Sequence, residues 1–259
     1  MFMEERQQEI ADIIKEIGKI TVSEITEKYE ISDESARRDL RILEKQGLCK
    51  RTHGGAIRLG QVNVRPPEDR SFDTMTILDT YREIAREAAR RIQDNDTIYL
   101  TGGSFGHIMC LFLPKDIHYT LIVNNVELGK ELRSFDTIDV FVVGGKMRRS
   151  GSITDSLAND FISRMHFDRC FITGAGLTAS FGLSNGTDET ATFQRTVMRN
   201  SRHKCLLIPG AKVGVDSFIK VCEAETFDEI ITDWDCTEDQ LQLLREKDIE
   251  ITVVKETRQ

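Results

Sequence analysis

Arg37, Arg38 and Arg41 are the residues in the N-terminal part of the chain whose type and spacing indicate a specific chemistry. Arginine binds phosphate groups and also recognises the edge of guanine through paired hydrogen bonds. Ser32 and Ser35 precede the arginines in the same segment, and we include both in the candidate DNA-contacting set. Taken alone, these residues leave open an ordinary solvent-exposed basic helix.

The arginines require a helix that turns them away from a core. Apolar residues recur with helical spacing through the same segment, at Ala36, Leu40 and Leu43. Ser32 or Asp33 is placed to cap the start of this helix, and Gly47 is placed to end it. The pattern predicts a short helix with one buried face and one arginine-rich face. We expect Asp39, between the arginines, to orient a neighbouring arginine rather than to contact DNA.

Two shorter helices precede the basic one. Isoleucines at helical spacing predict a first helix over residues 5–18, and a short β-branched stretch follows at 20–22. Ser23 is expected to cap a second helix that ends near Tyr29, and residues 30–32 make a turn. Two short helices, a tight turn and a basic third helix are typical of a helix-turn-helix domain.

A hairpin is expected after the basic helix. Residues 48–58 contain two short extended segments around the glycine pair 54–55, which suits the β-wing of a winged helix, although a plain hairpin with incidental charges is the alternative. In the wing interpretation Lys50, Arg51 and His53 lie near the phosphate backbone of DNA.

A long and spacing-dependent motif links these segments to a known family. The sequence Ser35-Ala36-Arg37-Arg38-Asp39-Leu40, together with residues 43–48 and the ending Arg51-Thr52-His53-Gly54-Gly55-Ala56, resembles the DNA-binding signature of the DeoR family of bacterial transcriptional regulators. The two positions before the arginines depart from the usual Thr-Ile. The resemblance implies a winged helix-turn-helix over residues 1–57 that binds double-stranded operator DNA.

Composition is that of an ordinary globular protein, with 39% hydrophobic and 30% charged residues. The net charge of −8 would argue against a nucleic-acid-binding protein if it were evenly spread. It is not, because residues 37–58 carry seven basic against two acidic residues, whereas residues 1–36 carry four against ten. Such a distribution favours a localised DNA-binding edge.

Several classes of site and location are not expected. The six cysteines form no CxxC pair and the five histidines are scattered, so we expect no metal site and no cofactor. No apolar run is long enough to span a membrane and the N-terminus is not a signal peptide, which predicts a cytoplasmic protein without a membrane partner.

Residues 58–76, with the adjacent prolines Pro66 and Pro67, are expected to form a linker. Residues 77–259 then form a second domain in which strands and helices alternate. Candidate strands cover 97–101, 119–123, 138–143, 170–173, 204–208, 229–232 and 249–253. Candidate helices cover 81–92, 106–113, 126–135, 155–165 and 189–199. The alternation predicts a Rossmann-like, mostly parallel α/β domain, so the whole chain is an α/β protein with a small winged helix-turn-helix.

Four glycine-bearing loops follow predicted strands and suit one composite anion site. Ligands of parallel sheets lie at the carboxyl ends of the strands, where glycine loops expose backbone N–H groups. The candidate effector-binding residues are Gly102, Gly103, Ser104, Asn124, Gly144, Gly145, Lys146, Gly174, Gly176 and Lys212.

The order of these loops is similar to that of the DeoR-family effector domain, which belongs with the ribose-5-phosphate isomerase-like sugar-phosphate folds. The resemblance therefore spans almost the whole chain and implies a phosphorylated-sugar effector. Several acids of the family pattern are absent, and Lys212 is the residue that remains of the usual Asp-x-Ser-Lys. We therefore hypothesise that the effector is an unusual anion or that effector control has weakened.

The leading interpretation is a repressor of a carbohydrate-metabolism operon that a phosphorylated sugar or related anion releases by changing how two DNA-binding domains are spaced. A symmetric operator implies a homo-oligomer, a dimer or a tetramer. One alternative is a regulator with a vestigial pocket whose second domain only oligomerises. A sugar-phosphate isomerase is the other, but it needs a carboxylate base where this chain has Gln194, and Asp188 and Glu189 suit capping instead. We expect no catalytic residues.

Overall fold

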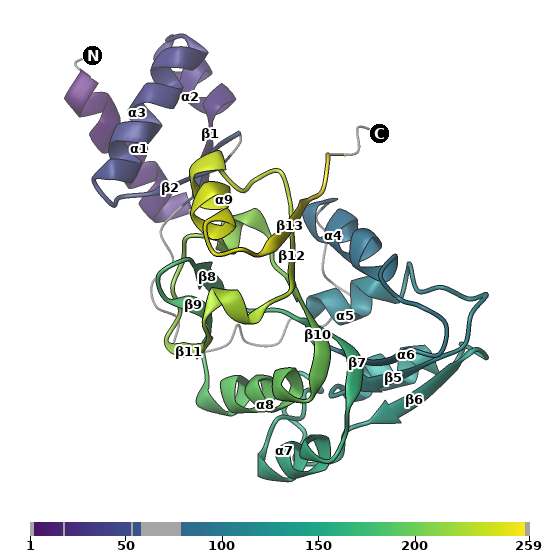
Figure 1. Cartoon of the computed structure of the whole chain (residues 1–259). Coiled ribbons are helices and arrows are strands. Elements are labelled where there is room, and N and C mark those ends of the chain that lie inside the picture. Colours follow the sequence, from purple (N-terminus) through teal and green to yellow (C-terminus); the bar gives the residue numbers. More distant parts are fainter. Residues whose placement is uncertain (1–2, 18, 53, 58–78, 257–259) are drawn as a thin grey trace.

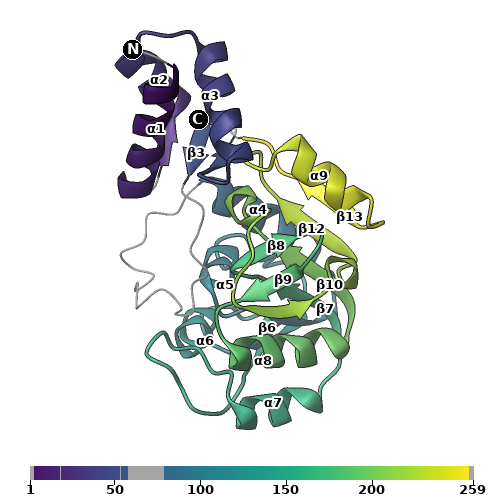
Figure 2. The same ribbon diagram turned by 90° about the vertical axis from the view of Figure 1, so that its left-hand side faces the viewer.

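The computed structural model describes residues 3–17, 19–52, 54–57 and 79–256. The predicted linker 58–76 and His53 lie outside these ranges. A small N-terminal domain lies at one end of the molecule and a larger α/β domain forms the rest, with α7 (Ser156–Ser163) and α8 (Asp188–Arg199) farthest from the small domain (Figures 1 and 2). Among the described residues, no helix is long and apolar enough to cross a membrane.

The small domain packs three helices on a three-stranded antiparallel sheet. The helices are α1 (Met3–Ile17), α2 (Val22–Tyr29) and α3 (Asp33–Lys45). The strands are β1 (Lys19–Thr21), β2 (Lys50–Thr52) and β3 (Gly55–Ile57), in the order β1-β3-β2. Ile14, Ile25 and Leu40 are fully buried in their common core. This is a winged helix-turn-helix, as predicted, with β2 and β3 as the wing.

The second helix begins earlier than expected. Thr21, not Ser23, is the N-cap of α2, and its hydroxyl accepts a hydrogen bond from the Glu24 N–H at 3.2 Å. The Glu24 carboxylate in turn accepts a hydrogen bond from the Thr21 N–H at 2.7 Å, which completes a capping box. The prediction of Ser23 was wrong because a Thr-x-x-Glu pair satisfies two backbone donors whereas Ser23 alone would satisfy one.

The larger domain is built on a parallel sheet. Within the described residues, seven strands form this sheet in the order β13-β12-β10-β7-β4-β5-β6. Their bounds are β4 (Thr97–Leu100), β5 (Tyr119–Val123), β6 (Ile138–Val142), β7 (Phe167–Ile172), β10 (Ser201–Leu207), β12 (Glu229–Thr232) and β13 (Glu250–Val253). The sheet overlaps every predicted strand. The strand order reverses at β4, because β5 and β6 lie on one side of it and β7 on the other.

Alternating residues of the strands face two separate cores. Ile98 and Leu100 point to the face covered by α4 (Asp79–Ala89), α5 (Ser104–Met109) and α6 (Val126–Leu132). Tyr99, between them, points to the face covered by α7, α8 and α9 (Glu238–Arg245). Because both faces are covered, the strands are near-continuous apolar runs, which explains why they were visible in the sequence.

A second, three-stranded antiparallel sheet was not predicted. It consists of β8 (Gly176–Thr178), β9 (Gly182–Asn185) and β11 (Ile219–Cys222), in the order β11-β9-β8. Two short 3₁₀ turns, η2 (Gly210–Lys212) and η3 (Ala224–Thr226), lie in the connections around it. The small sheet packs against α8 and lies beside the carboxyl end of β7, so it helps to wall the region where a ligand is expected.

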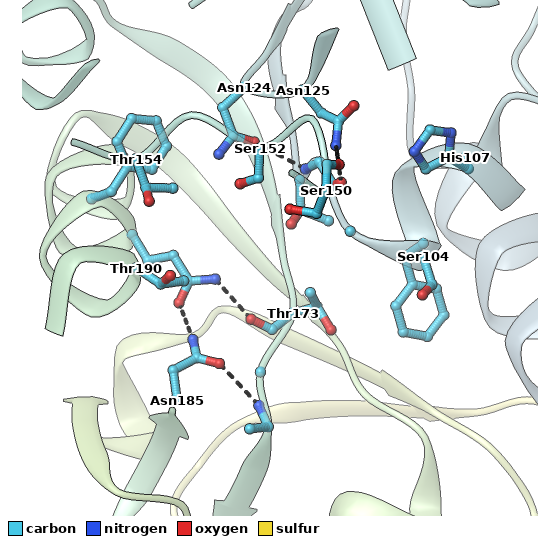
Figure 3. Close-up of a pocket in the computed structure, with 18 of the residues that line it drawn as sticks. Ser104, His107, Asn124, Asn125, Ser150, Ser152, Thr154, Thr173, Asn185 and Thr190 are labelled. Carbon is cyan, nitrogen blue, oxygen red and sulfur yellow. Dashed lines mark hydrogen bonds between the residues drawn. The ribbon is translucent and has the colours of Figure 1, made fainter. Parts of the chain in front are cut away.

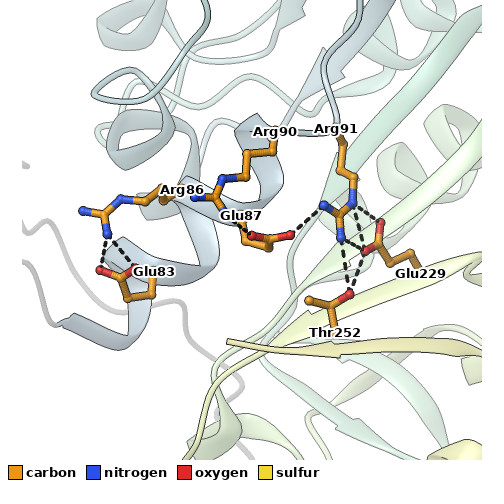
Figure 4. A network of polar contacts seen from close by, with 7 residues as sticks. All are labelled: Glu83, Arg86, Glu87, Arg90, Arg91, Glu229 and Thr252. Atoms are coloured by element: carbon orange, nitrogen blue, oxygen red, sulfur yellow. Dashed lines mark hydrogen bonds and ion pairs between the residues drawn. The ribbon is translucent and has the colours of Figure 1, made fainter. Parts of the chain in front are cut away.

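Polar contacts join the C-terminal end of α4 to the edge of the large sheet formed by β12 and β13 (Figure 4). The guanidinium of Arg91 donates to the carboxylate of Glu229 on β12 at 2.6 Å and to the hydroxyl of Thr252 on β13 at 3.3 Å. It also donates to Glu87 at 2.7 Å. Glu229 is only 2% exposed, so this is a largely buried ion pair that connects the start of the larger domain with its last strands.

Candidate functional site

The arginines of α3 lie on its exposed face. Ala36, Leu40 and Leu43 are buried in the core of the small domain, whereas Arg37, Arg38 and Arg41 are exposed. Ser32 is the N-cap of α3 and its hydroxyl accepts a hydrogen bond from the Ser35 N–H at 3.3 Å. The two serine hydroxyls lie 3.0 Å apart at the exposed start of the helix. The face presented to solvent is therefore the one that a recognition helix inserts into the major groove.

Asp39 on α3 has a different arginine partner from the one expected. Its carboxylate accepts hydrogen bonds from Arg6 Nε at 2.7 Å and from Gln7 Nε2 at 2.8 Å, both on α1. Asp39 is 1% exposed, so it ties α1 to α3 from within the domain. It is an arginine partner, as predicted, but of Arg6 and not of the arginines beside it.

The wing positions its two described basic residues differently from each other. Arg51 is half-buried, its N–H donates to Glu44 Oε1 at 2.7 Å, and its guanidinium lies 3.8 Å from the other oxygen of the same carboxylate. It can reach a phosphate by leaving Glu44. His53, the third residue predicted for this group, lies outside the described residues.

Lys50 does not lie on a DNA-facing tip, which corrects the prediction. Its side chain is 3% exposed, and its Nζ donates a hydrogen bond to the carbonyl oxygen of Gly210 in the larger domain at 2.9 Å. Burial lowers the pKa of Lys50 from its ordinary value to about 8. The strand β2 is turned so that Lys50 faces the larger domain, and the residue is therefore unavailable for phosphate in this arrangement.

A pocket of about 630 Å³ opens at the carboxyl ends of β4, β5, β7 and β10 (Figure 3). This is the place where the strand order reverses, and ligands of open parallel sheets bind there. The volume is in the range of small-molecule sites. Six of the predicted effector-binding residues line it: Gly102, Gly103, Ser104, Asn124, Gly174 and Lys212.

The other four candidates lie outside the pocket lining, and close packing explains two of them, Gly145 and Gly176. A Cβ on Gly145 would lie 2.2 Å from Asp155 Oδ1, and one on Gly176 would lie 2.2 Å from the Val215 carbonyl oxygen. Gly144 and Lys146 are exposed on the loop after β6, at the outer edge of the sheet. That loop contributes Arg149, Ser150 and Ser152 to the pocket instead.

Asn124 and its neighbour Asn125 hold the glycine loop in place. Asn124 Oδ1 accepts hydrogen bonds from the Gly102 N–H and from the Tyr99 hydroxyl, each at 3.0 Å, and its Nδ2 donates to the Ile153 carbonyl oxygen at 3.1 Å. Asn125 Nδ2 donates to the Gly102 carbonyl oxygen at 3.0 Å. Asn124 thus borders the pocket mainly as a support of its wall.

Gly103 is the position in this loop with room beside it. An added Cβ would meet only Thr173 Cγ2, at an ordinary contact distance of 3.7 Å. At Gly102 the same addition would collide with Asn125 Cβ at 2.6 Å and with Asn124 Oδ1 at 2.8 Å. The space next to Gly103 therefore belongs to the pocket, whereas the space next to Gly102 is filled by the protein.

The wall that faces this loop carries amides where an isomerase needs an acid. Gln194 is 5% exposed, its Oε1 accepts from Asn185 Nδ2 at 2.6 Å, and its Nε2 donates to the Thr173 carbonyl oxygen at 2.8 Å. Asn185 Oδ1 accepts from the Ala175 N–H at 3.1 Å. An amide cannot act as a general base, so this wall can bind polar groups but cannot take a proton from carbon.

The charged groups in the lining are two cations and two carboxylates, of which Glu127 is exposed. Lys212 donates to the Gly174 carbonyl oxygen at 3.3 Å and lies over the ring of Tyr81, 5.9 Å from its centroid. Arg149 is exposed at the rim. The carboxylate of Glu131 lies 2.8 Å from Nδ1 of His107, which is 8% exposed. Lysine and arginine together suit an anionic ligand.

One buried hydroxyl in the lining has no partner. Thr154 is 5% exposed, and its Oγ1 makes no hydrogen bond to any described residue. Buried hydroxyl groups are almost always hydrogen-bonded, so one that borders a pocket points to a ligand that supplies the partner. Sequence reasoning missed this residue and also His107, Asn185 and Gln194 as pocket lining; Gln194 was noticed only as the place of a missing acid.

No metal site is apparent among the described residues, which contain no group of three or more His, Cys, Asp or Glu side chains that could hold an ion. The chemistry that the site offers is the binding of a polar anion of small-molecule size.

Two family models match the chain. The one described as DeoR-like helix-turn-helix domain matches residues 6–62, and the one described as DeoR C terminal sensor domain matches residues 78–234.

Full-length relatives extend the match. An uncharacterized HTH-type transcriptional regulator, YulB, of Bacillus subtilis (strain 168) is 28% identical over 98% of both chains. The HTH-type transcriptional regulator GolR of Listeria innocua is 30% identical over 90% of this chain and 91% of the relative. The lactose phosphotransferase system repressor of Lactococcus lactis is 30% identical over 88% of this chain and 90% of the relative.

Proposed function

Because the chain belongs to the DeoR family of transcriptional regulators, we propose that it represses a carbohydrate-metabolism operon and is released by a phosphorylated sugar or a related anion. The chain is a DNA-binding regulator and not an enzyme, since its family and its full-length relatives are named as regulators. The name of the Lactococcus relative, a lactose phosphotransferase system repressor, supports sugar metabolism as the regulated process.

The proposed DNA contact is made by the exposed face of α3. Arg37, Arg38 and Arg41 would lie in the major groove, and Ser32 and Ser35 would approach the phosphate backbone at the start of the helix. From the wing we retain Arg51 and His53 as candidates for phosphate contact and leave out Lys50, which is buried against the larger domain.

The pocket carries the effector half of the proposal. The observation that supports it most strongly is the combination, in one cavity, of Lys212, the room beside Gly103 and the unpartnered hydroxyl of Thr154. In this arrangement the phosphate lies against the loop 102–104 with Lys212 and Arg149 near it. The sugar hydroxyls face Thr154 and the amide wall of Asn185 and Gln194.

Symmetric operators are bound by symmetric proteins, so the regulator is proposed to act as a homo-oligomer, either a dimer or a tetramer. Its place of action is proposed to be the cytoplasm, where the regulated DNA and phosphorylated metabolites occur together.

The test is a mobility-shift titration of the full-length protein on DNA from upstream of its own gene, with sugar phosphates added one at a time. Release of DNA by one compound, and not by its unphosphorylated sugar, supports the proposal and names the pathway. Binding that no compound changes would favour the alternative of a vestigial pocket. Failure to bind that DNA with salt-dependent affinity would contradict the DNA-binding assignment.

A further inference from the structure

Lys50 of the wing is buried against the larger domain, where it contacts a short turn that also contributes to the pocket. Its Nζ donates to the Gly210 carbonyl oxygen at 2.9 Å. Gly210 begins the turn η2, and Lys212, which ends it, lines the pocket. Lys50 therefore contacts the start of this turn from the DNA-binding domain, and Lys212 at the end of the turn lines the pocket.

The carbonyl of Gly210 is sensitive to any movement of this turn. It also accepts the hydrogen bond from the Val213 N–H that closes η2, at 3.0 Å. A rotation of the turn that opens or tilts this bond necessarily redirects the oxygen that Lys50 contacts. Because hydrogen bonds weaken steeply with poor angle, a small rotation is sufficient to release the lysine.

The N–H of Gly210 anchors the start of the turn, while its carbonyl oxygen faces Lys50. The Gly210 N–H donates to Asp233 Oδ2 at 3.0 Å, and Asp233 Oδ1 accepts from the Asp235 N–H at 2.8 Å. Asp233 is fully buried. A Cβ on Gly210 would lie 2.2 Å from the Cys236 backbone nitrogen, so the turn is packed directly on this loop and cannot slide toward it.

The Lys212 side chain, at the pocket end of the turn, is held less firmly than the turn's backbone. The contact of Lys212 with the Gly174 carbonyl oxygen is long, at 3.3 Å, and its ammonium rests over the ring of Tyr81. A phosphate is a stronger partner for an ammonium than a carbonyl oxygen is. An anion in the pocket therefore draws the Lys212 side chain from Gly174 and pulls on the last residue of η2. The backbone beyond that residue is anchored, because the Gly214 N–H donates to the Leu177 carbonyl oxygen at 2.6 Å, so the turn can rotate but not slide.

We propose that η2 is the mechanical link between effector and DNA: an anion that binds Lys212 turns η2, withdraws the Gly210 carbonyl from Lys50 and frees the wing from the larger domain. The link rests on the proposed function, because it assigns the regulation of that same pocket. It requires no contact between effector and DNA-binding domain, and it places the two-state element in three residues.

The experiment is hydrogen exchange with mass spectrometry on the full-length protein, comparing wild type with K50M and K50Q. Loss of the Lys50 contact is expected to speed exchange of the amides in residues 209–214 about tenfold, as the loss of a hydrogen bond from a charged donor predicts. K45M, which removes an exposed lysine of α3, is the matched control and should leave that segment unchanged. Circular dichroism establishes that each variant is folded.

The second arm adds inorganic phosphate and ribose 5-phosphate as probes. In wild type, a probe that binds is expected to speed exchange in residues 48–52, and in K50M that segment should already be fast and should not respond. Unchanged exchange of 209–214 in both variants would overturn the link, even if the probes release DNA normally. If the variants speed exchange in 209–214 but neither probe changes exchange in 48–52 of wild type, the contact exists and the effector assignment is contradicted. The two failures can therefore be told apart.

Discussion

Arg38 and Arg41 are the side chains on which the proposed DNA contact most directly depends. Each is exposed on α3, and a bidentate contact to a base contributes about 1–3 kcal/mol to discrimination between sequences. R38A and R41A are therefore each expected to weaken operator binding about tenfold or more, measured by fluorescence anisotropy on labelled DNA. R164A, a matched loss of the exposed arginine that follows α7, should bind like wild type. Equal affinity of all three variants would show that α3 does not read the operator.

Substitution of Thr154 is expected to change the affinity for the effector without lowering the free energy of unfolding. Valine has nearly the shape of threonine, so T154V removes an unpartnered buried hydroxyl at no packing cost and should leave the free energy of unfolding unchanged or slightly higher. Affinity for the effector should fall, because the proposed ligand hydroxyl loses its partner. Urea denaturation and isothermal titration calorimetry measure the two quantities. Reduced stability with unchanged affinity would mean that the hydroxyl is structural.

At the scale of residues, the sequence allowed part of each site to be predicted. The arginines of α3 were predictable because they lie off an apolar stripe of helical period. The glycine loop 102–104 was predictable because it follows a buried strand. The inward orientation of Lys50 was not, because its acceptor Gly210 lies 160 residues away, and only tertiary packing brings the two together.

At the scale of elements, the segment that follows α4 is fixed to the sheet by the pair of Arg91, two residues beyond the helix, with Glu229 on β12. Removing one partner of a buried pair leaves the other charge uncompensated, which costs about 3–5 kcal/mol. R91M is expected to lower the free energy of unfolding by about that amount, measured by urea denaturation. R90M, which breaks an exposed pair with Glu87 on the same helix, should cost no more than about 0.5 kcal/mol. Similar losses in both variants would mean that burial of the Arg91 pair contributes nothing.

The strands that were predicted differ in composition from the strands that were missed. Strands such as β4 and β5 are nearly apolar runs because both faces of the parallel sheet are covered, and the sequence displays them directly. The strands β8 and β9 are three or four residues long and rich in glycine, serine and threonine, so their pairing depends on neighbours and not on a pattern of their own. The small sheet they form was therefore invisible before the structure.

At the scale of the whole molecule, docking of the wing on the larger domain should depend on pH. Burial lowers the pKa of Lys50 from 10.5 to about 8 in the docked form. Between these values the undocked form holds more protons, so raising the pH through this window favours docking, and below about pH 8 this contribution does not change. Groups that face Lys50 are Glu44, Asp233, Asp235 and Cys236.

Energy transfer between a dye on α1 and a dye on α7 reports the separation of the two domains. The docked fraction in wild type is expected to increase from pH 8 to pH 10, whereas K50M should show no such increase. A docked fraction that falls over this range in wild type alone would contradict the assigned contact.

The molecule as a whole joins the small domain that carries α3 to a larger domain whose pocket lies at the carboxyl ends of its strands. The placement of the pocket at the carboxyl ends of β4, β5, β7 and β10 followed from the order of strands and loops in the chain. How the two domains meet did not, because the residues between them carry no periodic pattern and the Lys50–Gly210 hydrogen bond joins positions 160 residues apart.

The central claim, that an anion in this pocket governs DNA binding, is tested most directly at Gly103. G103A places a methyl group in the free space of the pocket without a collision, so operator affinity should equal that of wild type. Release of DNA by the effector, followed by anisotropy as sugar phosphate is added, should be lost or need at least tenfold more compound. G144A, at an exposed glycine with open space around it, is the control and should be released like wild type. If G103A is released at the same concentration as wild type, the effector does not bind in this pocket.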